Sequence, residues 1–408
     1  MNHLCMLISK KATLILSVIF TLTTVLCSCG NDDNEDYVEP TKADNTIFVF
    51  MPWTQSINSA LVDNVNDMLA GIKANGGLGN DKLVLFVSSS ATKANLIQIL
   101  YKDNQCVRDT LKTYTNPDYT TTTGLSSIMN EVASKVPGNK YSMIIGCHAL
   151  GWVSIDAWAK LPQYYPASSA KRYYTSSFSY ENSSPITRAL GGDSEQYQLE
   201  ISTLSDAISN SNIKKLQYII FDNCYMANME VAYQLKDVTN YIIGSTCEIL
   251  TYGIPYSKIW TCITGTLDYQ GVCDGYKSYY SSDAATLSAI NCSEAENMAY
   301  IMKEINKLYT YDTSDNIQIL DGLPITVFFD MGDYVKHLCK DNTTLYSSFE
   351  TELSKLVPYY VSTGKFYSEF NNKTTTITSY SGISISDPSQ NPVISTEKLN
   401  TSWYSATH

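Results

Sequence analysis

The sequence predicts an α/β protein with a mostly parallel sheet that is covered by helices on both faces. Short, continuously apolar runs are typical of strands buried on both faces, and here they alternate with segments whose apolar residues recur at helical spacing. The apolar runs lie at residues 45–51, 81–90, 140–148, 214–224 and 240–248. The helical patterns lie at residues 60–77, 124–137, 204–210 and 226–238.

Residues that commonly end strands and helices occur where this alternation predicts an end. The first run, "NTIFVFM", ends at Pro52, as a strand often does. The helical pattern that follows places Leu61, Val65 and Met68 on one face and stops at Gly76, a residue common just after a helix. The remaining runs repeat this order of strand and helix, so a single layered sheet is expected.

Beyond residue 270 the alternation becomes less regular. Residues 293–309 predict a helix, residues 324–338 a strand followed by a helix, and residues 374–388 are Thr/Ser-rich and β-like. We therefore expect a core at 46–270, with a polar insert at about 153–200, and a smaller C-terminal subdomain or extension at 271–408.

The N-terminus has the layout of an export signal. Lys10 and Lys11 precede an apolar stretch at 12–26 that is short for a membrane span, and small residues follow it. The segment "LCSC" resembles a bacterial lipobox, which predicts a signal peptide at 1–28 and lipid on Cys29. A plain signal peptide or an N-terminal anchor helix remains the alternative.

Residues 29–45 are acidic and Asn-rich, without an apolar pattern, and predict a solvated tether. Acidic residues directly after the lipidated Cys resemble the surface-export signal of Bacteroidetes lipoproteins; an ordinary flexible linker is the alternative. The predicted location is the bacterial cell envelope, as an outer-membrane lipoprotein that is surface-exposed or periplasmic and attached to the membrane by its N-terminal lipid.

Composition narrows the classes of partner. The chain of 408 residues is 44% hydrophobic and 17% charged, which is typical of a globular protein. Its net charge of −12 argues against nucleic acid as a partner. The cysteines show no CxxC pair and no zinc-ligand spacing, so no metal site and no cofactor are predicted.

Reactive side chains follow the ends of three predicted strands. His148 ends one run, Cys224 ends "YIIFDNC", and Cys247 ends "YIIGSTC". Ligands bind at the carboxyl ends of the strands in open parallel sheets. A thiol and an imidazole there are the minimal arrangement for nucleophilic acyl transfer. Taken singly, each residue has a plainer reading, as a hydrogen-bonded structural His or a buried Cys.

The segment "YIIFDNCYMANMEVAYQLKDVTNYIIGSTCEILTYGIPY" resembles the nucleophile region of the clostripain family of cysteine peptidases. The stretch "MIIGCHALGW" is similar to the same family's strand followed by Asp-His-Gly-x-Gly-Trp. The resemblance runs nearly the whole mature length. It implies a caspase-like fold, which is a three-layer α/β/α sandwich, and cleavage of peptides or proteins after Arg or Lys.

The resemblance also implies roles for single residues. Cys224 would be the nucleophile and His148 the general acid/base, and the backbone N–H groups of Ala149 and Cys224 would form the oxyanion hole. In relatives the residue at the position of Asp222 binds the basic side chain of the substrate, so the resemblance implies that role here. Residues i and i+2 of a strand share one face, which lets Asp222 line the pocket beside Cys224. The alternative for Asp222 is a cap of the following helix. We expect a monomer. Some relatives depend on calcium, and no EF-hand loop occurs here, so calcium stays open.

This chain departs from the family pattern beside the histidine. Cys147-His148-Ala149 replaces Asp-His-Gly, and Leu150 replaces a small residue. A Cβ at position 149 would clash if that residue required a positive φ. Cys147 and Cys247 are rival thiols. The alternative function is therefore a catalytically weak or inactive pseudo-peptidase that acts as a cell-surface binding lipoprotein, with glycan or host-ligand binding as a third class.

Relatives are activated by cutting themselves between the histidine and the cysteine, after a basic residue. In this chain Lys171, Arg172 and Arg188 are the candidate sites. An exposed loop that is never cut is the alternative.

Overall fold

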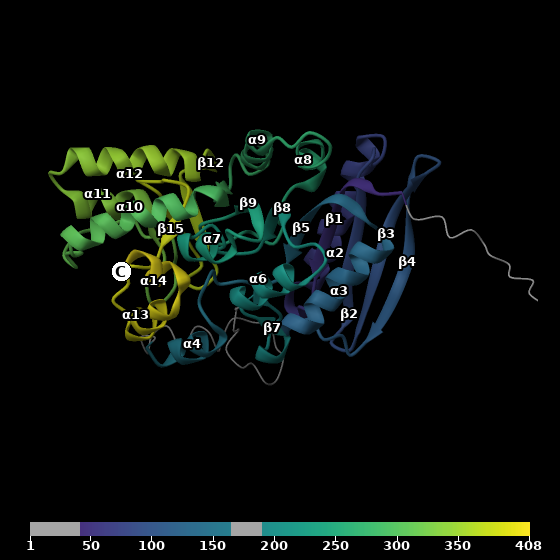
Figure 1. Cartoon of the computed structure of the whole chain (residues 1–408), viewed down its shortest axis with the longest axis horizontal. Helices are drawn as coiled ribbons and strands as arrows, with labels where there is room; N and C mark the ends of the chain where they lie inside the picture. Colours follow the sequence, from purple (N-terminus) through teal and green to yellow (C-terminus); the bar gives the residue numbers. More distant parts are fainter. Residues whose placement is uncertain (1–40, 165–189) are drawn as a thin grey trace, which may run out of the picture. The chain divides into compact units, whose positions relative to one another are not determined.

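A computed structural model describes residues 41–164 and 190–408 of the chain. Residues Thr41–His408 form one compact unit (Figure 1). The predicted signal peptide at 1–28, Cys29 and most of the tether lie outside the described residues. The division into a core at 46–270 and a C-terminal subdomain stays a prediction.

Within the described residues, one nine-stranded sheet has the strand order β12-β10-β9-β8-β5-β1-β2-β3-β4. Its middle five strands, β9, β8, β5, β1 and β2, are parallel, and the outer strands on each side pair antiparallel. The strands are β1 (Ala43–Met51), β2 (Lys82–Ser90), β3 (Lys93–Lys102), β4 (Gln105–Thr115), β5 (Gly138–Gly146), β8 (Leu216–Asp222), β9 (Thr239–Gly244), β10 (Thr286–Asn291) and β12 (Tyr359–Ser362). The predicted mostly parallel sheet is confirmed.

Helices cover both faces of this sheet (Figure 1). One face packs against α2 (Asn58–Ala74), α8 (Tyr256–Ile263) and α9 (Tyr269–Tyr279). The other face packs against α3 (Thr122–Lys135), α6 (Ile201–Asn210), α7 (Met229–Leu235), α10 (Ala295–Leu308), α11 (Met331–Cys339), α12 (Thr343–Leu356) and α14 (Ser402–Thr407). The described residues therefore form a three-layer α/β/α arrangement. Two short helices, α4 (Ile155–Lys160) and α13 (Pro392–Glu397), are the remaining α-helices of these residues.

A hydrophobic core lies on each face of the sheet, and the buried strands have continuous apolar runs because their side chains enter both cores. In β1, Ile47, Val49 and Met51 enter the core beneath α2, whereas Phe48 and Phe50 enter the core on the other side. Successive side chains of a strand point to opposite faces, so a strand covered on both sides must be apolar at every position.

In the part of the chain that the structure describes, three two-stranded sheets lie outside the central one. They are formed by β6 (Leu190–Gly191) with β7 (Gln198–Leu199), by β11 (Phe329–Asp330) with β15 (Ser384–Ile385), and by β13 (Lys365–Ser368) with β14 (Lys373–Thr376). The predicted strand-then-helix at 324–338 corresponds to β11 and α11, and the β-like stretch at 374–388 contains β14 and β15.

Two features of the sheet differ from the sequence prediction. The β3/β4 hairpin extends one edge and was not predicted. Strand β4 is mostly exposed and polar, and β3 mixes buried with half-buried positions instead of forming a continuous buried run. Strands β5 and β8 end at Gly146 and Asp222, two residues before His148 and Cys224. Both residues therefore lie in the loops after their strands.

No helix within residues 41–164 and 190–408 combines the length and the apolar character needed to cross a membrane.

Candidate active site

The two strand ends that precede His148 and Cys224 lie side by side at the carboxyl edge of the sheet. Strands β5 and β8 are parallel neighbours, and Gly146 pairs with Asp222 at their ends. Just beyond, Asn223 Nδ2 donates to the carbonyl oxygen of Cys147 at 2.8 Å and to its Sγ at 3.1 Å. The structure thus brings the two loops together at the edge where open parallel sheets bind ligands.

His148 is held by backbone and side-chain contacts. Its N–H and C=O exchange two hydrogen bonds with Gly191, both of 3.0 Å. Its ring Nε2 lies 2.7 Å from Ser56 Oγ and 3.3 Å from Asp193 Oδ1. The side chain is largely buried, with 7% of its surface exposed. The imidazole is therefore fixed at the sheet edge rather than free to rotate into solvent.

Asp193 is an acidic neighbour of the histidine that sequence reasoning missed. Burial by itself raises the pKa of Asp193, but hydrogen bonds from His148 and Ser56 outweigh it, so the pKa is lowered on balance. Asp193 belongs to the polar insert, where no periodicity singles it out. Ser56 could have been suspected, because it lies just past the carboxyl end of β1, the strand beside β5.

Three thiols lie near this edge, and they differ in exposure. Cys147 and Cys247 are buried, and burial raises the pKa of both, to about 12 in the case of Cys247. Cys224 is half-buried, in the loop after β8. A thiol reacts as its thiolate, and apolar burial suppresses the thiolate. Of the three, Cys224 is the least buried.

The residue after Cys224 is held in an unusual backbone conformation. Tyr225 has a φ of +63°, which is rare for a bulky residue. Its ring stacks on Phe328 with centroids 5.1 Å apart, and its hydroxyl donates to Glu248 Oε1 at 2.8 Å. Its N–H donates to the carbonyl oxygen of Cys247 at 3.0 Å. These contacts hold the turn that follows Cys224.

The loop after His148 accommodates its departures from the family pattern. Ala149 does not have a positive φ, so its Cβ causes no backbone strain. No described residue accepts a hydrogen bond from its N–H. Leu150 is buried in the core rather than lying over the site. The positive φ of +58° falls at Gly151, where a Cβ would come within 2.6 Å of Asn228 Nδ2.

Asp222, the last residue of β8, is buried among hydrogen-bond donors. Its Oδ2 accepts from Asn64 Nδ2 at 2.8 Å and from the Tyr256 hydroxyl at 3.0 Å, and its Oδ1 accepts from the Ile254 N–H at 3.0 Å. Burial raises its pKa to about 6, against the effect of these bonds. The capping alternative does not hold, because the side chain of Asn228 caps α7. Sequence reasoning missed Asn64 and Tyr256, which come from α2 and α8.

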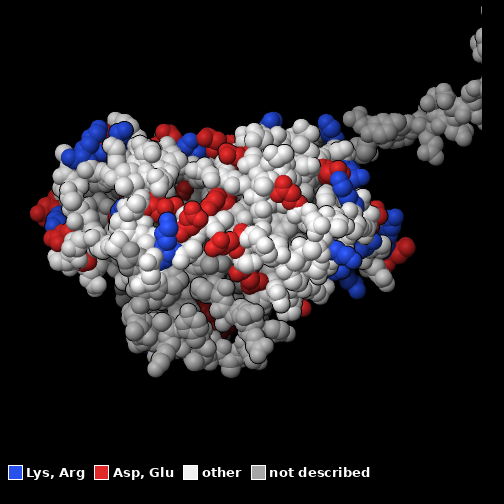
Figure 2. All heavy atoms as spheres, turned by 90° about the horizontal axis from the view of Figure 1, so that it is seen from below, with Lys and Arg blue, Asp and Glu red and all other residues white. Residues whose placement is uncertain are grey.

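A cavity of about 470 Å³ lies beside Asn64 and Pro255, next to these donors. Its lining includes two further carboxylates, Asp63 and Asp67, along with Ser56 from the histidine contact. Figure 2 shows Asp and Glu side chains gathered toward the middle of one face, with Lys and Arg toward its two ends. The carboxylates of Asp63 and Asp67 make the cavity beside Asn64 suitable for a cationic group.

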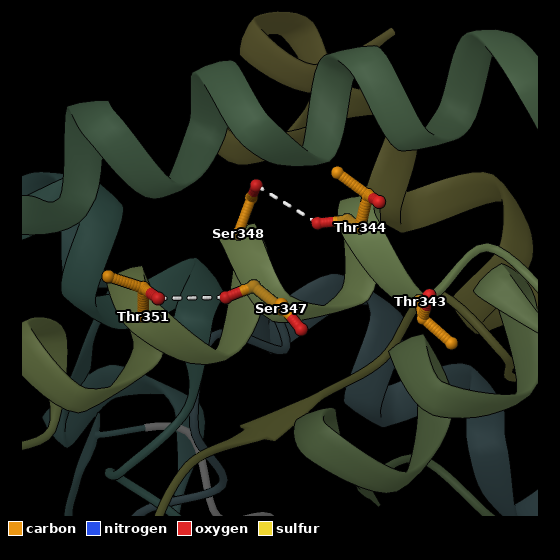
Figure 3. Close-up of a pocket in the computed structure, with 5 residues that line it drawn as sticks. All are labelled: Thr343, Thr344, Ser347, Ser348 and Thr351. Carbon is orange, nitrogen blue, oxygen red and sulfur yellow. Dashed lines mark hydrogen bonds between the residues drawn. The ribbon is translucent and has the colours of Figure 1, made fainter.

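A second hollow, of about 410 Å³, lies along α12 and offers no comparable chemistry (Figure 3). Its lining consists of exposed hydroxyl residues of that helix, two of which, Ser348 and Thr351, bond to backbone carbonyls one turn earlier. No thiol, imidazole or carboxylate lines it.

Some predicted residues lie outside the described part of the chain, namely Cys29 and the cleavage candidates Lys171, Arg172 and Arg188. Among the described residues, no group of three or more His, Cys, Asp or Glu side chains is arranged to hold a metal ion.

Comparison with known proteins identifies the relatives of this chain. A sequence model described as the clostripain family matches residues 175–397. The structure of a secreted C11 cysteine protease from Bacteroides thetaiotaomicron, "iotapain", is similar over 90% of this chain and 100% of its own, with 41% identity and a TM-score of 0.80. No curated protein matches.

Two other solved structures are similar. A clostripain from Bacteroides thetaiotaomicron ATCC 29148, in complex with the peptide inhibitor BTN-VLTK-AOMK, is 48% identical over 53% of this chain and 98% of its own, with a TM-score of 0.51. An inactive zymogen C11 protease from Parabacteroides distasonis is 24% identical over 90% of this chain and 99% of its own, with a TM-score of 0.75, which is a likeness of fold alone. The expected caspase-like fold is confirmed. The chain belongs to the clostripain family of cysteine peptidases.

Proposed function

We propose that this cysteine peptidase cleaves after Arg or Lys, with Cys224 as nucleophile, His148 as general acid/base and Asp222 selecting the basic side chain. The observation that carries the proposal is that Asp222 ends the strand that leads into Cys224, beside the loop of His148. A basic side chain bound near Asp222 would then leave the following peptide bond close to the thiol and the imidazole.

The chemistry proceeds in two acyl transfers. His148 accepts the proton of Cys224, and the thiolate attacks the substrate carbonyl carbon. The resulting oxyanion accepts hydrogen bonds from the N–H groups of Ala149 and Cys224. The imidazolium gives its proton to the leaving amine, which leaves an acyl group on Cys224. Water then attacks that thioester as His148 takes its proton. Collapse of the second intermediate releases the new carboxyl end of the peptide and the thiolate, and the imidazolium returns its proton to restore the Cys224 thiol.

The preference for a basic residue rests on charge in a small, enclosed region. An ionised carboxylate has about four acceptor positions, and Asp222 uses three of them within the protein. The remaining position can accept from a guanidinium or an ammonium. The carboxylates of Asp63 and Asp67, which line the adjoining cavity, add negative potential. Charge-assisted hydrogen bonds of this kind are about twice as strong as neutral ones.

A relative supports the same preference. The clostripain from Bacteroides thetaiotaomicron is complexed with the inhibitor BTN-VLTK-AOMK, whose peptide ends in Lys. This chain is 48% identical to that protein over the matched region. A Lys-ending peptide is therefore a reasonable starting point for a substrate or an inhibitor of this chain.

Matched peptides test the proposal. We expect kcat/KM for a fluorogenic peptide with Arg before the scissile bond to exceed that of its citrulline analogue by about 10- to 100-fold, since only Arg is charged. Asp222→Asn should remove most of this ratio, whereas Asp103→Asn, in the β3/β4 turn, should leave it unchanged. Equal cleavage of both peptides by the wild type would contradict the specificity, and activity surviving Cys224→Ala would contradict the nucleophile.

We further propose that the chain is an envelope lipoprotein. Support comes from the lipobox-like "LCSC" and the acidic tether, and one relative is described as secreted. Metabolic labelling with an alkyne fatty acid should mark the full chain and not Cys29→Ser. Equal labelling of the two would refute the anchor.

Self-cleavage in the insert is the last part of the proposal. Self-cleavage would need a basic residue in the insert, and Lys171, Arg172 and Arg188 are the candidates. Purified wild type should be cut after one of them, and Cys224→Ala should stay intact. Wild type that stays intact while cleaving peptides would remove this step without affecting the peptidase proposal.

A further inference from the structure

The imidazole of His148 meets two side chains from separate segments. Ser56 comes from the short helix η1 (Gln55–Ile57) that follows β1, and Asp193 comes from the turn after β6. Ser56 Oγ and Asp193 Oδ1 both approach Nε2, at 2.7 and 3.3 Å. Ser56 also donates to Asp193 twice, from its N–H to Oδ2 at 3.1 Å and from its hydroxyl to Oδ1. The three residues form one connected cluster.

We propose that Asp193, together with Ser56, is a positioning residue that orients and charges His148, so that the catalytic apparatus includes a carboxylate from the segment after the insert. This inference rests on the proposed function, because it assigns a partner to the proposed general base. It differs from a Cys-His dyad acting alone, in which no side chain supports the imidazole.

The contacts at Nε2 define which ring nitrogen exchanges protons. A neutral imidazole that carries its proton on Nε2 can donate it to Ser56 or Asp193, which leaves Nδ1 as the acceptor for the thiol proton. When His148 takes up that proton, the ionised carboxylate of Asp193 stabilises the resulting imidazolium, in the way that an aspartate supports the histidine of a serine protease triad. The thiolate–imidazolium pair is favoured as a result.

Two glycines allow Asp193 to reach this position. Gly191 exchanges backbone hydrogen bonds with His148 and has a φ of +138°, and a Cβ there would lie 2.3 Å from the carbonyl oxygen of Tyr197. A Cβ on Gly192 would lie 2.3 Å from the carbonyl oxygen of Trp53. The Gly191-Gly192-Asp193 sequence therefore passes through a space that admits no side chain before it presents the carboxylate. The two glycines at the end of the insert therefore allow Asp193 to lie beside His148.

The experiment measures turnover and thiol reactivity in the full chain. For Asp193→Asn we expect kcat on the Arg peptide to fall about 10- to 100-fold and KM to change less than about threefold, because the imidazolium loses its charged partner while the side-chain volume is kept. The rate of Cys224 alkylation by iodoacetamide, followed by mass spectrometry of the Cys224 peptide, should fall with kcat. Asp193→Glu should recover part of both.

Glu195→Gln is the matched control, because it removes one exposed negative charge from the same turn. It should change neither kcat nor the alkylation rate. Ser56→Ala provides a second variant if Asp193→Asn does not fold, and it should lower the same two quantities. Unchanged kcat and alkylation in both variants would overturn the inference, as would a loss confined to KM or one that is equal in Glu195→Gln.

His148→Ala separates this inference from the proposed function. If His148→Ala does not slow alkylation of Cys224, the dyad itself is wrong. If His148→Ala slows alkylation and Asp193→Asn does not, the dyad stands and the role of Asp193 is wrong.

Discussion

Asn223 joins the two loops of the proposed dyad, because its side-chain Nδ2 donates to the carbonyl oxygen of Cys147 at 2.8 Å. Asn223 immediately precedes Cys224, and Cys147 immediately precedes His148. The hydrogen bond therefore continues the contact between β5 and β8 past the last paired residues, Gly146 and Asp222. Both members of the dyad leave the sheet from positions fixed relative to each other.

Loss of this link should impair turnover more than binding. In Asn223→Ala the carbonyl of Cys147 stays buried without its donor, and the two loops can separate. We expect kcat to fall about 10-fold or more with a smaller change in KM, since the bond and the unpaired carbonyl together amount to about 1–3 kcal/mol. Steady-state kinetics on the Arg peptide measures this. A change in KM alone would show that Asn223 serves the substrate pocket instead.

The pH dependence of specificity should follow Asp222. Burial raises the pKa of this carboxyl from 3.8 to about 6. The ionised form prevails above that pH and attracts a cation, and the protonated form below it does not. The ratio of kcat/KM for the Arg peptide to that for the citrulline peptide should therefore decrease as pH falls through about 6. Because the dyad acts on both peptides, its own titration cancels in the ratio. A ratio that is constant between pH 5 and 8 would contradict the assignment.

Tyr225 should stabilise the turn through both its ring and its hydroxyl. Tyr225→Phe removes the bond to Glu248 and should lower the free energy of unfolding by about 1–2 kcal/mol. Tyr225→Ala also removes the stack on Phe328 and leaves a cavity, so it should cost about 3–5 kcal/mol. Urea unfolding monitored by circular dichroism gives both values. Equal losses in the two variants would mean that the ring contributes nothing.

Glu230 predicts a dependence of stability on pH. Burial and the charge of Asp387 raise its pKa from 4.5 to about 8 in the folded state. The folded protein thus binds this proton more tightly than the unfolded chain, so the associated stability is full below pH 4.5 and is lost as pH rises through about 8. Glu230→Gln, which keeps the acceptor for the Ser386 N–H, should stabilise by a few kcal/mol at pH 8–9 and little at pH 5. Equal effects at both pH values would contradict this.

The sequence predicts the central layers well because burial leaves a strong signature. The runs that became β1, β2, β5, β8 and β9 are apolar on both faces, and the helices between them have one apolar stripe. The β3/β4 hairpin escaped prediction because β4 lies at the sheet edge and carries mostly exposed polar side chains. Edge strands do not need the pattern that marks buried ones.

Only those residues of the candidate site that directly follow an apolar strand could be predicted from the sequence. His148, Cys224 and Asp222 follow apolar runs, so their shared edge could be inferred from the topology of a parallel sheet. Asp193 and Ser56 lie in polar stretches, and their convergence on His148 depends on a fold that brings residues 137 positions apart into contact. No local spacing encodes such a contact.

Covalent labelling of the nucleophile tests the central claim most directly. The wild type, Cys147→Ala, Cys247→Ala and Cys224→Ala should each be treated with a peptidyl acyloxymethyl ketone that ends in Lys, and the adduct located by peptide mass spectrometry. The account predicts one adduct, on Cys224, in the first three proteins and none in Cys224→Ala. An adduct on Cys147 or Cys247 of the wild type, or labelling that persists in Cys224→Ala, would contradict it.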